Sequence, residues 1–120
     1  MTKIILTVPA LVAMFAVTAA NAHAMLDHAD PRVGSTVSAS PRELVLWFSE
    51  QLEPAFSTVE VRNGSGARVD AGKAQLSHSN RTELHVPLKS LPPGSYRVFW
   101  RVLSVDTHRT QGNFSFRVGP

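Results

Sequence analysis

Cysteine is absent from the sequence. Disulfide bonds, thiolate zinc sites and redox-active cysteine pairs are therefore excluded, because each of them needs a thiol. If the chain is exported to an oxidising compartment, its stability must come from the packing of its core or from a bound metal ion.

Long apolar runs are also scarce, and the only one lies at the start of the chain. Lys3 precedes an apolar run over residues 4–20, and Ala20-Asn21-Ala22 has the small-x-small pattern of a peptidase cleavage site. We therefore expect residues 1–22 to be a cleaved signal peptide and residues 23–120 to be an exported domain without a membrane span. An uncleaved anchor is the alternative, because about 20 apolar residues can span a bilayer.

Basic clusters are missing as well. Removing Lys3 from the 12 basic side chains leaves 11 basic against 9 acidic ones. The arginines are scattered along the chain from Arg32 to Arg117. Because a nucleic-acid-binding protein normally shows a basic stripe or patch, we expect no nucleic-acid partner.

Short segments with alternating apolar and polar residues fill the region after residue 22. Turn-forming Pro, Gly, Asn and Asp residues separate them. The segments expected to be strands are residues 25–28, 43–48, 57–62, 73–78, 82–88, 94–103 and 113–118. This spacing predicts a single all-β domain, a seven-stranded antiparallel Greek-key sandwich or barrel of immunoglobulin-like type, with a cupredoxin-like topology as the alternative.

The two tryptophans are expected to differ in burial. Trp100 lies on the apolar side of the strongest alternating segment, residues 94–103, and is expected in the core. Trp47 has the opposite parity to Leu46 and Phe48, so we expect it to be partly exposed.

The segment Asp106-Thr107-His108 carries candidate metal ligands. If it is extended, residues i and i+2 project to the same side, so the carboxylate and the imidazole would converge. By itself this spacing is common on the surface of β-proteins. A further ligand is needed before the pair indicates a site.

Cleavage after Ala22 would supply that ligand. It would give His23 a free α-amine, which together with Nδ1 of the same residue can close a chelate ring on one metal ion. An amine, two imidazoles and a carboxylate form the N,N,N,O set that suits tetragonal Cu(II). A second small-x-small triplet at residues 22–24 leaves cleavage after Ala24 as an alternative, and that cut would remove His23.

Together these features resemble the CopC-like copper-resistance and copper-carrier domains of the bacterial periplasm. The resemblance covers essentially all of residues 23–120. It is carried by His23 with the following short strand and proline turn (23–31), by LVLWFSEQLE (44–53), by Pro-Gly-x-Tyr-x-Val-x-Trp-x-Val (93–102), and by Asp-Thr-His with the following Gly and Phe-x-Phe-x-Val (106–118).

The resemblance implies a metal site and its location. It places one Cu(II) per chain on the amine and ring of His23 with Asp106 and His108, and it implies an outer-shell role for Glu50. Some family members carry a second, Cu(I) site in a methionine-rich loop, but Met25 is the only methionine after residue 22. Because Cu(I) selects soft thioether ligands, we expect a single Cu(II) site.

The expected function is therefore non-enzymatic. We expect a periplasmic Cu(II)-binding protein for sequestration, buffering or delivery, with a membrane copper importer or another periplasmic copper protein as the recipient. Copper affinity should fall on acidification, since the amine and imidazoles must be deprotonated to bind. Two alternatives stay open: a histidine-brace copper monooxygenase, disfavoured because Asp106 would fill the position an oxidant needs, and a β-sandwich interaction module that binds no metal.

Several other residues carry potential ligand atoms or lie next to the candidate ligands. His28 is five residues from the new terminus and should face away in a straight strand, whereas His78 and His85 are expected at the surface. Met25 is expected to be a partly buried edge residue. Arg109 would either steer a partner or offset the neighbouring carboxylate.

Overall fold

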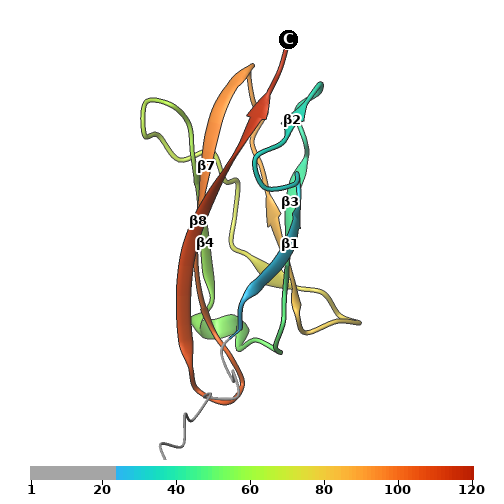
Figure 1. Ribbon diagram of the computed structural model, residues 1–120, viewed down its shortest axis with the longest axis vertical. Helices are drawn as coiled ribbons and strands as arrows, with labels where there is room; N and C mark the ends of the chain where they lie inside the picture. Colours follow the sequence, from blue (N-terminus) through green and yellow to red (C-terminus); the bar gives the residue numbers. More distant parts are fainter. Residues whose placement is uncertain (1–23) are drawn as a thin grey trace, which may run out of the picture.

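The computed structural model describes residues 24–120 as two packed β-sheets (Figure 1). The first sheet has the order β1-β3-β6-β5, with β1 Leu26–Asp30, β3 Glu43–Phe48, β6 Glu83–Pro87 and β5 Gln75–Leu76. The second has the order β2-β8-β7-β4, with β2 Thr36–Val37, β8 Arg109–Val118, β7 Gly94–Leu103 and β4 Thr58–Arg62. Within residues 24–120 a single 3-10 turn, η1, covers Pro54–Phe56. The expected signal peptide and His23 lie outside the described residues, and within residues 24–120 no helix could cross a bilayer.

The predicted all-β class is confirmed, and the architecture is a sandwich. The expectation of seven antiparallel strands was wrong in two respects, because the described chain has eight strands and β2 pairs with β8 in parallel. β2 has only two residues, too few to show an alternating pattern. β8 begins four residues earlier than expected, since its ladder with β7 continues to the pair Leu103↔Arg109 through residues that carry no apolar alternation.

The core lies between the sheets and is built from the inward positions of the alternating segments. The fully buried large side chains include Leu44 and Leu46 of β3, Val98 of β7 and Phe116 of β8. Trp100 is 6% exposed, as predicted, and its ring meets that of Phe48 edge to face with the centroids 5.2 Å apart. Trp47 is half-buried on the opposite face of β3, also as predicted.

Gly112 permits the close approach of the Trp100 ring. A Cβ at position 112 would lie 2.5 Å from Cζ2 and 2.8 Å from Cε2 of Trp100, which is a rigid, buried ring. We expect Gly112→Ala to lower the free energy of unfolding by about 1–3 kcal/mol, because the added methyl overpacks the core. Urea denaturation measures the effect, with Gly64→Ala as the control, since nothing lies within 4 Å of a Cβ at position 64. Equal denaturation midpoints for the two variants would contradict this explanation.

Candidate metal site

Asp106 and His108 lie in the tight turn between β7 and β8, at the end of the sandwich where β1 begins (Figure 1). The expectation that Asp106-Thr107-His108 is an extended segment was wrong. Thr107 has a φ of 74°, in the left-handed region, and its N–H donates to the carbonyl of Ser104 at 2.9 Å. The turn nevertheless brings the two candidate ligands together, with Nδ1 of His108 3.3 Å from Oδ1 of Asp106.

Thr107 has an unusual backbone conformation for a β-branched residue. The left-handed region is unfavourable for such side chains, and residues held there against this preference are concentrated at functional sites. Here the consequence is local: the reversal at Thr107 places the side chains of residues 106 and 108 on the same side of the turn.

Ser104 organises the turn, and sequence reasoning missed it. Its side chain is fully buried, and its hydroxyl donates to Oδ1 of Asp106. Oγ of Ser104 also accepts a hydrogen bond of 3.3 Å from the N–H of His108. The signal that could have found it is parity, because Ser104 continues the inward-facing positions of Trp100 and Val102 and places a hydroxyl where an apolar side chain would be expected.

The protonation state of Asp106 follows from these contacts. The hydrogen bond from Ser104, together with the nearby ring of His108, holds the pKa of the Asp106 carboxyl below its ordinary value. The carboxylate is therefore anionic at neutral pH, as a metal ligand must be.

The start of the described chain is fastened beside this turn. Ala24 is fully buried, and its carbonyl accepts a hydrogen bond of 2.5 Å from Oγ1 of Thr110, the second residue of β8. Met25 and Ser49 exchange two hydrogen bonds of 2.9 Å, from Met25 N–H to Ser49 Oγ and from Ser49 N–H to the Met25 carbonyl. These contacts hold Ala24 beside Thr110, which is two residues along the chain from His108. Neither Thr110 nor Ser49 was singled out from the sequence.

Glu50 follows β3 on a segment that runs beside the turn. The next residue, Gln51, accepts a hydrogen bond of 3.0 Å from the N–H of Val105, and Leu52 forms a bridge with Ser104. Glu50 is half-buried there. Its outer-shell role remains a prediction.

The other candidate ligands lie elsewhere. The ring of His28 stacks on Trp47 with the centroids 4.3 Å apart, and its Nδ1 is 2.7 Å from Oδ2 of Asp27. His78 is exposed, and Met25 is 55% exposed, so the expectation of a partly buried methionine was wrong. Among residues 24–120 no three His, Asp or Glu side chains form a group that could hold a metal ion.

His85 has a structural role on the outer face of β6. Its Nδ1 lies 3.3 Å from Glu43 Oε2 and its Nε2 lies 3.3 Å from Glu83 Oε2. Burial lowers the pKa of His85, but the hydrogen bonds to the two carboxylates outweigh it and raise the pKa above its ordinary value. The two carboxylates contact different nitrogens of the ring, on opposite sides. They therefore cannot bind one metal ion together with a single His85 nitrogen.

The raised pKa of His85 predicts a pH-dependent contribution to stability. Because the folded-state pKa lies above the unfolded value, the contribution is complete below about pH 6.5 and is lost as the pH rises through the folded-state pKa. We expect the stability difference between the wild type and His85→Gln to shrink across this window by less than about 1 kcal/mol, the usual size for partly exposed pairs. Urea titrations of both proteins at about pH 6 and about pH 9 measure it. A pH-independent difference would contradict this role for His85.

Known proteins resemble this chain in sequence and in fold. Residues 26–119 match the CopC domain. The chain is 38% identical over 98 residues to protein YobA of Escherichia coli (strain K12), covering 81% of this chain and 79% of that protein. It is 36% identical over 118 residues to copper resistance protein C of Xanthomonas campestris pv. juglandis, covering 93% and 92%. The crystal structure of CopC from Methylosinus trichosporium OB3b matches with a TM-score of 0.77 at 35% identity, over 82% of this chain and 95% of that chain.

The domain match begins at Leu26, the first residue of β1, and spans both sheets and the β7–β8 turn. The relatives match over most of their own lengths, and more than a third of the aligned residues are identical to those of this chain. This chain therefore belongs to the CopC family.

Proposed function

We propose that this protein binds one Cu(II) ion per chain in the periplasm and serves in copper sequestration, buffering or delivery. The ligands are the α-amine and imidazole of His23, the carboxylate of Asp106 and the imidazole of His108. The observation that carries the proposal is the turn in which Asp106 and His108 lie 3.3 Å apart beside the anchored Ala24. His23 is joined to Ala24 by one peptide bond, so the fastening of Ala24 to β8 supports its place among the ligands.

The donor set favours the cupric ion. Nitrogen donors and one anionic oxygen suit Cu(II), whereas Cu(I) prefers thioethers and thiolates. The described chain has no cysteine and a single methionine, Met25. The low pKa of Asp106 keeps the anionic ligand available at neutral pH.

The test is a Cu(II) titration of the secreted protein, followed by electron paramagnetic resonance. We expect one equivalent to bind and the spectrum to show nitrogen coupling. Binding of no copper, or a spectrum without nitrogen coupling, would refute the proposal. In a second arm, the copper-loaded protein is incubated with reductant and chitin or cellulose, and oxidised oligosaccharides would instead identify a monooxygenase.

Ser104 is proposed as a positioning residue for both ligands on the turn. We expect Ser104→Ala to lower the Cu(II) affinity by about 10- to 100-fold, the usual cost of losing an outer-shell hydrogen bond. The pKa of Asp106, followed by NMR in the apoprotein, should rise because its strongest hydrogen bond is lost. Ser90→Ala, at an exposed position, is the control. An unchanged affinity in a folded Ser104→Ala protein would show that the turn holds its shape without the hydroxyl.

A further inference from the structure

The two sheets differ in charge. The strands of the first sheet contain no Lys or Arg and carry four carboxylates, Asp27, Asp30, Glu43 and Glu83. The strands of the second sheet carry one carboxylate, Glu60, and five arginines, Arg62, Arg97, Arg101, Arg109 and Arg117. The domain therefore presents one acidic and one basic face.

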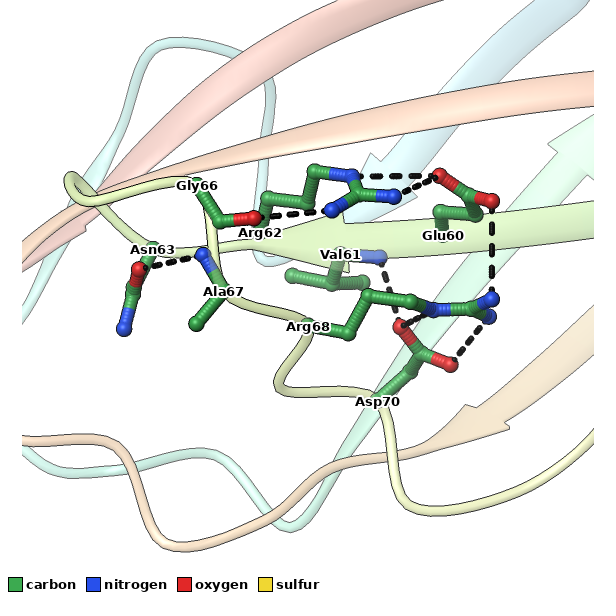
Figure 2. A network of polar contacts seen from close by, with 8 residues as sticks. All are labelled: Glu60, Val61, Arg62, Asn63, Gly66, Ala67, Arg68 and Asp70. Carbon is green, nitrogen blue, oxygen red and sulfur yellow. Dashed lines mark hydrogen bonds and ion pairs between the residues drawn. The ribbon is translucent and has the colours of Figure 1, made fainter.

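Carboxylates neutralise the basic charge of the second sheet at one edge and not at the β7–β8 hairpin. Figure 2 shows that Glu60 lies between Arg62 and Arg68, at 3.1 Å and 3.5 Å, and that Arg68 also pairs with Asp70 at 2.7 Å. This network neutralises the edge at β4. The network does not reach the β7–β8 hairpin, whose two strands contain four arginines and no Asp or Glu.

The arginines of the hairpin point outward and lack acidic partners. Arg97 donates to Oδ1 of Asn113 at 2.6 Å, and Arg117 donates to Oγ of Ser95, so their partners are neutral. Arg101 and Arg109 form no ion pair with any other residue from 24 to 120. We call the exposed surface formed by Arg97, Phe99, Arg101, Arg109 and Arg117 the cationic hairpin face.

The cationic hairpin face is shallowly hollowed along its length. One depression of about 300 Å³ is bordered by Arg97 and Phe99, a second of about 320 Å³ by Phe99 and Arg101, and a third of about 240 Å³ by Arg101 and Arg109. Phe99, which is 38% exposed, stands between the first two. Each depression is thus bordered by at least one guanidinium group.

We propose that the cationic hairpin face binds the surface of an anionic phospholipid membrane. Guanidinium groups bind phosphate oxygens in a bidentate manner, and the face carries four of them with no carboxylate on its strands. From Arg109 to Arg117 the strand spans about 27 Å, which suits an extended charged surface. The middle of the face is the exposed Phe99, which pairs with Asn113, and Arg97 and Arg101 lie on either side of it.

Membrane binding would orient the domain. β8 begins at Arg109, directly after His108, so the β7–β8 turn would lie at the border of the membrane contact. The inference does not depend on copper, because the face is complete in the metal-free chain. If the protein bound no copper, the membrane proposal would be unaffected. If it bound no membrane, the proposed copper site would be unaffected.

The test is sedimentation of the metal-free protein with vesicles of phosphatidylglycerol and phosphatidylcholine, compared with phosphatidylcholine alone. We expect binding only to the anionic vesicles, with loss at high salt. The double variant R97Q/R101Q should weaken the partition coefficient by about 30-fold, because each arginine near an anionic surface contributes about fivefold.

The matched control is R42Q/R81Q, which removes the same charge from exposed positions outside the hairpin and should bind nearly as well as the wild type. If the two double variants lose vesicle binding equally, binding depends on net charge alone and the proposal is overturned. Absence of vesicle binding would also overturn it. A third outcome would overturn it as well: the protein binds itself or polyglutamate but no vesicles, and this binding disappears in R97Q/R101Q. The face would then bind a second copy of the chain or an acidic protein.

Discussion

We expect His108→Ala to lower the affinity for Cu(II) by more than about 100-fold. Removing an outer-shell group alone costs 10- to 100-fold, and His108 is proposed to bind the ion directly. The remaining amine, imidazole and carboxylate would leave one position of the tetragonal set to water. A competition titration with a chelator of known affinity measures the loss, and the resonance spectrum of the variant should show weaker nitrogen coupling.

Two features make this variant informative. The His108 side chain is about half exposed, so its removal should leave the fold intact, and the thermal unfolding of the apoprotein checks this. The control is His78→Ala, which removes an exposed histidine far along the chain from the turn. Equal affinities for the two variants would exclude His108 as a ligand, and the Cu(II) site proposed at this turn would be wrong.

A single glycine added before His23 should cost as much as the loss of His108. The extension turns the α-amine of His23 into an amide, so the chelate ring cannot close, although the imidazole remains. No side chain is removed by the addition. We therefore expect an unchanged unfolding temperature of the apoprotein and a Cu(II) affinity lower by more than about 100-fold.

The measurement starts from the intact mass of the exported protein, which must correspond to residues 23–120. Copper should raise the melting temperature of this form, because a ligand that binds only the folded state stabilises it, and the shift should be much smaller for the glycine-extended form. A protein that begins at Met25, or an extended protein with undiminished affinity, would rule out the amine as a ligand.

The positions of the main strands along the chain could be predicted because the burial of one strand face is visible in the local alternation of apolar and polar residues. In a strand that is covered on one face, every second residue is apolar, and residues 43–48 and 94–103 show this pattern without reference to any partner. The same pattern placed Trp100 inside and Trp47 at the surface. β2 could not be predicted, since its two residues are held by a parallel pairing with the end of β8, which lies about 80 residues further along the chain.

The candidate site was found from residue types, but part of the reason given for it was wrong. Asp106 and His108 are brought together by a left-handed turn at Thr107 and a buried hydroxyl from Ser104, and not by an extended strand. A turn of this kind depends on hydrogen bonds that close only when β7 and β8 pair. Spacing alone could therefore not distinguish it from a strand.

By itself, the sequence determined the all-β class, the positions of the main strands and the ligand types on which the proposed copper site rests, because these depend on alternation and on the chemistry of individual side chains. Only the tertiary structure decided which residues position the candidate ligands Asp106 and His108 and which face of the domain is basic. Ala24 meets Thr110 across 86 residues, and four arginines that look scattered in the sequence lie on one face. Both results follow from strand pairing, which joins distant segments in a register that no local pattern encodes.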